Sequence, residues 1–393
     1  MSKQTILVVD DEDFNRKIII DILVQSKYDY SVLSANNGKI GCELAEKFMP
    51  DLILMDWKMP EMTGIEAIKQ LKSREKTKDI PVLMITAVTS PEKLQEAFGA
   101  GVVDYITKPV KEIELLVRIR SVLKTNTYYK EIIRQKEEIE SQKKDITDSI
   151  RYAQHIQKAI LPKIDEIQSA LVESFVLFKP KDIVSGDFFW FTQKKKIFIA
   201  ACDCTGHGVP GAFVSMIGNV LLNQIIIEKG IDSPAKILSL LNNEIKSVFT
   251  RKGSEQQASD GMDITLCAFD KDLVTLEFAG AQNPLFLIRK GELIDIKGDR
   301  QPIGGSTEFD YNFTNHEIEL QKGDNIYIFS DGYPDQIGGP KERKFMSKQF
   351  KQLLLDIQGK SMEEQKQILG QTIEKWKGEL DQIDDILVIG VRV

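Results

Sequence analysis

Acidic residues stand at the ends of short apolar stretches in the first third of the chain. Asp10 and Asp11 follow one such stretch, and Asp56 ends another. Crowded carboxylates repel one another unless a cation neutralises them, and Mg²⁺ prefers oxygen ligands in octahedral geometry. We therefore expect Asp11 and Asp56 to bind Mg²⁺ directly and Asp10 to act through water.

Two later apolar stretches lead to Thr86 and Lys108, which add a hydroxyl donor and a cation. Both groups suit the oxygens of a phosphoryl group, and Asp56 has the carboxylate that could attack its phosphorus. Each residue alone has an ordinary explanation, such as a turn, a strand or an exposed charge. Together, at successive strand ends, they indicate a site that accepts a phosphoryl group.

A second set of acids lies from Asp187 onward, each beside an apolar run. Its members are Asp187, Asp203, Asp331, Asp384 and Asp385. Carboxylates from distant segments can form an oxygen-lined site for one or two hard cations. A two-metal site clamps a phosphate and lowers the pKa of a bound water. This set predicts metal-dependent hydrolysis of a phosphate without a Ser or Cys nucleophile.

Two other kinds of site are weaker interpretations of the same region. Cys202, Cys204 and His207 suggest zinc, but their spacing is not that of a zinc knuckle and no second ligand pair follows. Small buried thiols are the alternative. Acyl-enzyme chemistry is disfavoured because no G-x-S-x-G motif occurs. His207, between two glycines and before Pro210, is expected to shape a turn, with proton transfer as its alternative role.

The elements that must position the first set alternate between short strands and helical stretches from Thr5 to about Lys124. The strands read TILVVD, SVLSA, DLILMD, PVLMITA and DYITKP. Such alternation is typical of a parallel, doubly wound sheet, which binds ligands at the carboxyl ends of its strands. We predict an α/β domain with a five-stranded parallel sheet at residues 1–124.

A helical linker is predicted at residues 125–165, within one long helix from about Ile113 to Ile164. That stretch lacks Gly and has its only proline at Pro162. One seam repeats every seven residues at Ile132, Ile139, Ile146, Ala153 and Ile160, whereas the companion seam is polar at Lys136 and Gln142 before it becomes apolar at Ile150 and Ile156. The pattern predicts a weak parallel coiled coil, and hence a homodimer. The alternative is a charged helix packed on its own domains.

The region from about Ser174 onward contains many short strands, with helical stretches at 210–229, 234–250 and 346–378. This arrangement predicts an α+β domain built on antiparallel sheets, to which we assign residues 166–393.

The bulk composition excludes several classes. A chain of 393 residues suggests two or three domains, at about 150 residues each. The net charge of −7 and the absence of a long basic stripe disfavour nucleic-acid binding. No apolar run approaches the about 18 residues of a membrane span, and the N-terminal run is too short for a signal peptide. Four cysteines are too few for a disulfide scaffold. We expect a cytoplasmic protein.

The motifs ILVVDDE, LMDWKMPEMTG, MITA and DYITKPV together resemble the CheY-like receiver family, over roughly residues 3–124. The resemblance implies that a cognate histidine kinase phosphorylates Asp56, and that the main-chain carbonyl of Lys58 is a further Mg²⁺ ligand. It also implies a cis Pro109 after Lys108. Thr86 and Tyr105 would form the switch through which phosphorylation alters the distal surface. The variable Lys58 side chain leaves the lifetime of the acyl phosphate open.

The segments SGDFFW, ACDCTGHG, FSDGYPD and QIDDILVIG, with AGAQNPLF and QPIGG, resemble the SpoIIE-type branch of the metal-dependent (PPM) Ser/Thr phosphatases, over roughly residues 174–393. The resemblance implies an αββα sandwich with two Mn²⁺ or Mg²⁺ ions between the sheets. Asp203 would bridge both ions and activate water, aided by the Cys204 carbonyl. Asp331 and Asp384 would hold one ion, and Asp187 the other, directly or through water. Asp385 is the less favoured alternative to Asp384.

One departure concerns the residue that holds the phosphate. Eukaryotic members of the PPM phosphatases use an arginine just before the first acidic motif, whereas this chain has only Lys179 and Lys181 in that region. The phosphate anchor is therefore unassigned.

These patterns favour a response regulator in which phosphorylated Asp56 controls a phosphatase acting on phosphoserine or phosphothreonine in another protein. By resemblance, that partner is often a small anti-anti-sigma protein. The alternative is a catalytically silent protein that sequesters a partner. A DNA-binding regulator or a nucleotide cyclase is disfavoured, because no terminal helix-turn-helix and no GGDEF-like motif occurs. The sequence does not fix whether phosphorylation activates or inhibits.

Overall fold

The protein is described from a computed structural model that covers residues 3–87, 90–249 and 260–393. The chain divides into two compact units, Met1–Lys143 and Lys144–Val393. Helix α5 (Glu112–Ile160) begins in the first unit and ends in the second.

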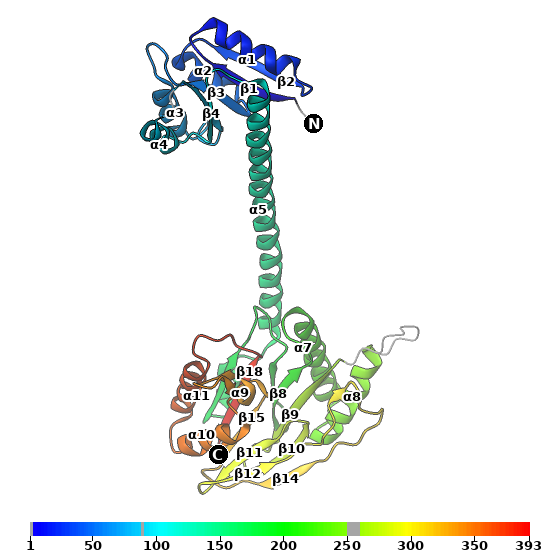
Figure 1. Ribbon diagram of the computed structural model, residues 1–393. Helices are drawn as coiled ribbons and strands as arrows, with labels where there is room; N and C mark the ends of the chain where they lie inside the picture. The colour runs from blue at the N-terminus through cyan, green and yellow to red at the C-terminus, as the bar shows by residue number, and fades with distance from the viewer. Residues whose placement is uncertain (1–2, 88–89, 250–259) are drawn as a thin grey trace. The chain divides into compact units, whose positions relative to one another are not determined.

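The first unit is built on one five-stranded parallel sheet with the order β2-β1-β3-β4-β5. The strands are β1 (Gln4–Val9), β2 (Tyr30–Ala35), β3 (Leu52–Asp56), β4 (Val82–Thr86) and β5 (Asp104–Thr107). The helices before α5 are α1 (Asp13–Gln25), α2 (Gly38–Phe48), α3 (Gly64–Ser73) and α4 (Pro91–Gly99). The predicted doubly wound α/β domain is confirmed (Figure 1).

Alternation along the strands gives this sheet a buried apolar layer on each face. In β1, Leu7 and Val9 join one core with residues of α2, α3 and α4. Ile6 and Val8 join the opposite core with residues of α1 and the start of α5. Since both faces are covered, the polar residues that follow the strands are exposed to ligands only at the sheet's carboxyl edge.

Helix α5 is a single helix of 49 residues, so the predicted long helix is confirmed, but it ends at Ile160 and not at the predicted Ile164. This end lies two residues before Pro162, because the residue that precedes a proline disfavours the helical conformation. Its first turns bury Leu115, Ile119 and Leu123 in the first unit.

The middle of α5 exposes the predicted heptad positions. Ile132, Ile139 and Ile146 are each 61–63% exposed in the single chain. An apolar stripe of this kind has no partner among the residues that the structure describes, so the stripe is available to a second helix.

The second unit contains two antiparallel sheets and a small hairpin. One sheet has the order β14-β10-β9-β8-β7, with β13 paired to β9, and the other has the order β12-β11-β15-β18-β6. The strands are β6 (Ser174–Lys179), β7 (Phe188–Gln193), β8 (Ile197–Cys204), β9 (Gly261–Phe269), β10 (Thr275–Ala281), β11 (Leu285–Arg289), β12 (Glu292–Ile296), β13 (Ile303–Gly304), β14 (His316–Glu319), β15 (Asn325–Phe329) and β18 (Ile386–Arg392). Strands β16 (Ile337–Gly338) and β17 (Arg343–Lys344) form the hairpin.

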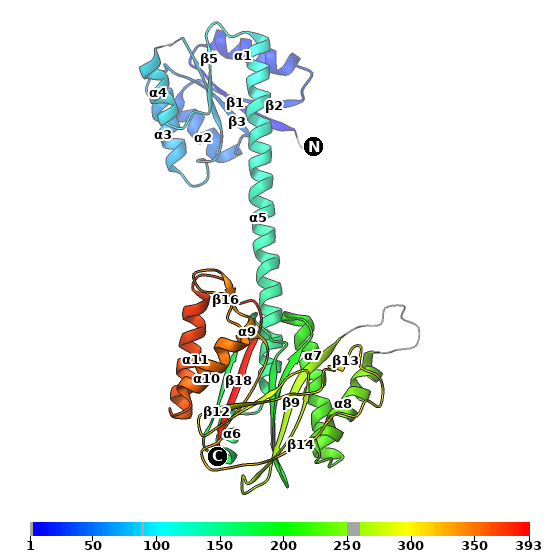
Figure 2. The same cartoon turned by 60° about the horizontal axis from the view of Figure 1, so that its bottom comes forward.

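Helices cover the outer face of each sheet. They are α7 (Gly208–Leu222), the π-helix η1 (Asn223–Glu228), α8 (Pro234–Phe249), α9 (Gly332–Asp335), α10 (Ser347–Ile357) and α11 (Met362–Lys377). The short helix α6 (Ile164–Ala170) instead packs Ile167 into the core between the sheets. One apolar core joins α7 and α8 to the first sheet, a second lies between the sheets, and a third joins α10 and α11 to the second sheet. The predicted αββα sandwich is confirmed, and Figure 2 shows the two helical layers on either side of the strands.

One helical prediction in this unit needs correction. The stretch 346–378 forms two helices, α10 and α11, because Ser361 starts a new helix with a capping box to Glu364. The stretch 210–229 is helical as predicted, with α7 continuing into the π-helix η1.

The segment Gly208–Glu228 is long and apolar enough to cross a membrane, although no apolar run of that kind was expected from the sequence. Leu221, Leu222 and Ile225 belong to the buried core under the first sheet, so packing in the domain accounts for its apolar character.

Candidate active sites

The acids of the first unit meet a single lysine at the carboxyl edge of the sheet. Asp10 follows β1, Asp56 ends β3, and Lys108 follows β5. The Lys108 Nζ atom lies 2.5 Å from Asp56 Oδ1 and 3.0 Å from Asp10 Oδ2. Asp10 is 1% exposed and Asp56 is 5% exposed. Two carboxylates therefore share one cation, which leaves a net negative charge that suits a divalent metal.

Burial decides the protonation properties of this cluster. It raises the pKa of Asp56 above its usual range, although the hydrogen bond from Lys108 opposes the shift. For Lys108, burial disfavours the charge, but hydrogen bonds to Asp56 and Asp10 outweigh it and raise the pKa. Lys108 thus stays protonated and can contact phosphoryl oxygens.

The remaining predicted residues of the first site lie around this cluster. The Lys58 backbone N–H donates to Asp56 Oδ2 (3.0 Å). This hydrogen bond keeps the Lys58 backbone, whose carbonyl is the predicted metal ligand, close to the Asp56 carboxylate. Asp11 is exposed, beside buried Asp10. Thr86 is fully buried at the end of β4. Tyr105, on the adjacent β5, packs edge-on against Phe98.

The peptide bond between Lys108 and Pro109 is cis, as the resemblance to receivers implied.

In the second unit, the acids come from the ends of strands in both sheets. Asp187 precedes β7 and Asp203 lies near the end of β8, both in the first sheet. Asp331 follows β15, and Asp384 lies just before β18, both in the second sheet. Since β8 contacts β15 and β18 directly, the fold brings acids nearly 200 residues apart to one edge of the sandwich.

These acids are close enough to change one another's protonation. Burial, followed by the charge of Asp331, raises the pKa of Asp203 to about 8. Burial and the charge of Asp203 raise the pKa of Asp187 well above its usual range. The pKa of Asp331 is raised by burial and then by Asp384. Buried carboxylates that repel one another are typical of a site that binds a cation.

A fifth acid, Asp263 on β9, belongs to this group and was not predicted from the sequence. It pairs with Asp203 in the register of β8 and β9. Burial, followed by Asp331, raises its pKa to about 7. In the sequence GMDITL, Asp263 looks like a polar residue in the usual polar and apolar alternation of a strand. Only the pairing of β8 with β9 shows that it lies opposite Asp203.

Asp385 has a different environment from Asp384. Its Oδ1 accepts from the Lys181 backbone N–H (2.7 Å), and its Oδ2 accepts from the N–H groups of Gly186 (2.7 Å) and Asp187 (3.4 Å). Asp385 is 2% exposed, so these donors occupy its carboxylate. Asp384 is partly exposed, and its carboxylate accepts a hydrogen bond from the Asp385 backbone N–H (2.8 Å). The geometry favours Asp384 as the acid that faces a metal.

The donor set fits hard divalent cations. Every acid offers oxygen, which Mg²⁺ and Mn²⁺ prefer, and Asp187 Oδ2 is buried without a hydrogen-bond partner among the described residues. Within residues 3–87, 90–249 and 260–393, no three His, Cys, Asp or Glu side chains are already arranged to hold a metal ion. That finding also gives no support to a zinc site at Cys202, Cys204 and His207.

Comparison with known families identifies both domains. The model of the response regulator receiver domain matches residues 6–120. The model of stage II sporulation protein E (SpoIIE) matches residues 193–393, which is more than half of the chain. This chain belongs to the SpoIIE family. Its SpoIIE domain is joined to a receiver domain.

Among solved structures, the SiaA-PP2C domain of Pseudomonas aeruginosa is 34% identical, with a TM-score of 0.58, and the match covers 64% of this chain and 98% of that one. Histidine kinase P4 of Formosa agariphila is 40% identical over 121 residues, which are 31% of this chain and 9% of the kinase. The regulator PhoB of Pseudomonas aeruginosa is 39% identical over 124 residues, 32% of this chain and 53% of PhoB. The two curated relatives therefore inform only the receiver domain.

Glycines allow the backbone of the SpoIIE domain to close around the acids. A Cβ on Gly211 would lie 2.0 Å from the Gly206 carbonyl oxygen, and one on Gly332 would lie 1.9 Å from the carbonyl oxygen of Asp385. Side chains at these positions would push the acidic segments apart.

The phosphate anchor was left unassigned, with Lys179 and Lys181 as the only cations near the first acidic motif. Lys179 forms an ion pair with Glu374, and the Lys181 backbone N–H donates to Asp385. A further cation, Lys344, lies on the β16–β17 hairpin. Its Nζ atom lies 2.6 Å from Asp335 Oδ2, and the Asp335 backbone N–H donates to the Asp331 carbonyl (3.0 Å).

His207 precedes α7 as its N-cap residue, and its Nδ1 atom lies 2.9 Å from Asp182 Oδ2. The side chain is more than half exposed, which fits the expected role in a turn.

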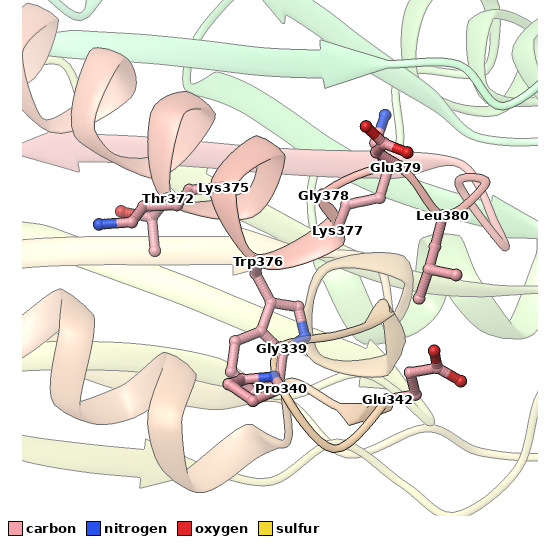
Figure 3. A pocket seen from close by; sticks show the side chains of 10 residues that line it. All are labelled: Gly339, Pro340, Glu342, Thr372, Lys375, Trp376, Lys377, Gly378, Glu379 and Leu380. Atoms are coloured by element: carbon pink, nitrogen blue, oxygen red, sulfur yellow. The ribbon is translucent and has the colours of Figure 1, made fainter.

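An open pocket of about 680 Å³ lies between the β16–β17 hairpin and the end of α11 (Figure 3). Trp376 forms its wall, and its indole N–H donates to the Gln336 carbonyl (3.1 Å). None of the aspartates of the acidic site lines this pocket, which is therefore separate from that site.

Proposed function

We propose that this chain is a two-component response regulator whose output is a Mn²⁺- or Mg²⁺-dependent protein serine/threonine phosphatase, controlled by phosphorylation of Asp56. The observation that carries the proposal is the meeting of Asp187, Asp203, Asp331 and Asp384 from two sheets. Burial and the neighbouring carboxylates raise the pKa values of the first three. A protein that only sequesters a partner has no need of this costly arrangement, which argues against the catalytically silent alternative.

The acids of the SpoIIE domain would hold two ions. Asp203 would serve both, with the Cys204 carbonyl beside it, while Asp331 and Asp384 would serve one and Asp187 the other. Bound divalent ions lower the pKa of water and neutralise phosphate charge. The chain's own contribution is to gather the carboxylates, to desolvate them, and to leave Asp203 partly accessible to a substrate.

Lys344 is the cation that we propose for holding the substrate phosphate. It lies on a surface hairpin, half exposed, and its ion pair with Asp335 places it one helical turn from Asp331. A phosphate with two negative charges could draw it from Asp335, since Lys is a mobile point charge.

In the receiver, a cognate histidine kinase would supply the phosphoryl group. A carboxylate oxygen of Asp56 forms the new bond to phosphorus, and the bond between phosphorus and the kinase histidine breaks. Asp10, Asp11 and the Lys58 carbonyl would hold Mg²⁺, and Lys108 would neutralise the phosphoryl oxygens. Thr86 and Tyr105 would carry the change to the distal surface.

The partners follow from the same proposal. The substrate would be a phosphoprotein of the anti-anti-sigma kind. The exposed isoleucines of α5 would pair two chains into a homodimer. The acidic charge and the absence of a basic stripe give no support for nucleic-acid binding. We place the protein in the cytoplasm, away from the membrane.

The test is direct. Purified full-length protein with Mn²⁺ should hydrolyse an aryl phosphate and a phosphoserine protein, and chelation by EDTA should stop both reactions. The double variant Asp203→Asn plus Asp331→Asn should be inactive. Full activity of that folded variant would refute the site.

A further inference from the structure

The last turns of α5 place a buried amide beside the acidic site. Gln157 is 5% exposed, although glutamine is usually a surface residue. Its Nε2 atom donates to the Ser185 carbonyl (2.6 Å) and to Ser215 Oγ (3.0 Å). Its Oε1 atom accepts from the Ser185 backbone N–H (3.1 Å). Both backbone polar groups of Ser185 are therefore bound by one side chain.

Ser185 begins the short segment that ends in Asp187. The next two N–H groups, from Gly186 and Asp187, donate to the buried carboxylate of Asp385. The segment is thus held from two sides, by an amide from α5 and by an acid that precedes β18. No strand pairing holds it, because β7 begins only at Phe188.

The side chain of Asp187 is fixed only in part by its own contacts. The Ser330 hydroxyl hydrogen-bonds to it, but its Oδ2 atom is buried without a hydrogen-bond partner among the described residues. The position of its carboxylate then follows the backbone of the segment. A Cβ on Gly186 would lie 2.5 Å from the Gly206 carbonyl oxygen, so the segment also packs closely on the loop after Asp203.

We propose that Gln157 is a positioning residue that fixes Asp187 for metal binding and thereby sets the metal affinity of the phosphatase site. The proposal rests on the proposed function above. Partners that orient metal-binding residues typically affect metal affinity by about 10- to 100-fold. Gln157 belongs to α5, so the end of the long helix is a structural part of the site.

The experiment measures Mn²⁺ binding to the full chain by titration calorimetry, with thermal unfolding in EDTA as a check of folding. Gln157→Leu should raise the Mn²⁺ dissociation constant by about tenfold or more. Excess Mn²⁺ should restore most of the turnover, and the KM for an aryl phosphate should change little. Gln157→Asn keeps a buried amide that is too short for both Ser185 groups, so it should weaken Mn²⁺ in the same direction and serves if the Leu variant does not fold.

Gln365→Leu is the matched control. Gln365 is fully buried in the same unit and binds the Tyr327 hydroxyl and two backbone carbonyls, but it contacts none of the acidic segments. This variant should lose stability and retain the native Mn²⁺ affinity.

Native Mn²⁺ affinity in folded Gln157→Leu or Gln157→Asn would overturn the positioning role, as would an equal loss of affinity in Gln365→Leu. If the native chain binds Mn²⁺ but hydrolyses no phosphate ester, the proposed function fails while the affinity comparison still tests Gln157. If the native chain binds no Mn²⁺, both proposals fail.

Discussion

Asp203 on β8 and Asp263 on β9 lie directly opposite each other in an antiparallel pair. Like charges at such positions, with Cβ atoms about 5 Å apart, destabilise a sheet. Burial raises the pKa of Asp203 to about 8 and that of Asp263 to about 7, so a proton partly relieves the repulsion in the metal-free protein. The relationship leads to the first two predictions.

Asp203→Asn should stabilise the metal-free phosphatase domain at pH 8 while abolishing its Mn²⁺-dependent activity. The folded state holds a proton on Asp203 more tightly than the unfolded state does, so native stability falls as pH rises from about 4 to about 8. The neutral Asn escapes this loss. We expect a gain on the order of 2 kcal/mol at pH 8 and almost none at pH 4, measured by urea unfolding in EDTA. A less stable variant at pH 8 would contradict the account.

Mn²⁺ affinity should increase with pH between 6 and 8. Metal binding requires deprotonated carboxylates, and the pKa values of about 8 and about 7 for Asp203 and Asp263 lie in or at the edge of this interval. Calorimetry in two buffers with different ionisation enthalpies should detect proton release, with an affinity change of about tenfold per pH unit for each proton released. Constant affinity over this interval would exclude these acids from the metal site.

Asp384→Asn and Asp385→Asn should fail in different ways. Asp384 is partly exposed, so its variant should fold normally and lose Mn²⁺ binding. Asp385 accepts three backbone N–H groups, and an Asn amide there would face some of them with its own donors. We expect Asp385→Asn to lose about 2–3 kcal/mol of unfolding free energy. The measurements are chemical unfolding and Mn²⁺ titration, and the reverse pattern would exchange the two roles.

Lys344→Met should raise the KM for phosphorylated substrates by about 3- to 10-fold with a smaller change in kcat, because a cation near the phosphate contributes to binding. Lys341→Met, on the same hairpin, is the control for a general loss of positive charge. Steady-state kinetics at saturating Mn²⁺ distinguish the two variants. Equal effects would assign the change to bulk electrostatics.

Beryllofluoride, which imitates the phosphoryl group on Asp56, should raise both the dimer fraction and the phosphatase rate, by about fivefold or more for the rate. The exposed Ile132, Ile139 and Ile146 motivate this expectation. Sedimentation and turnover are the measurements, and the Asp56→Asn chain should not respond. Ile139→Gln combined with Ile146→Gln should remove the dimer response, and a full rate response in that monomeric variant would separate activation from pairing.

The receiver could be predicted almost completely from sequence. Asp10, Asp56 and Lys108 each follow an apolar strand, and parallel strands bring their carboxyl ends to one edge, so local pattern and site geometry agree. The long helix could also be predicted from the sequence, because helix propensity and the position of Pro162 are local properties.

The acidic motifs around Asp187, Asp203, Asp331 and Asp384 could likewise be found in the sequence, since each acid interrupts or borders an apolar run. Tertiary structure decided which carboxylates share one place. Cross-strand register brought Asp263 to Asp203, and backbone donors separated Asp385 from Asp384, neither of which a linear pattern encodes. Gln157 is one polar residue among many on a charged helix, and only packing against Ser185 distinguishes it. Sequence sets residue chemistry and local conformation, whereas burial and long-range register determine which groups act together.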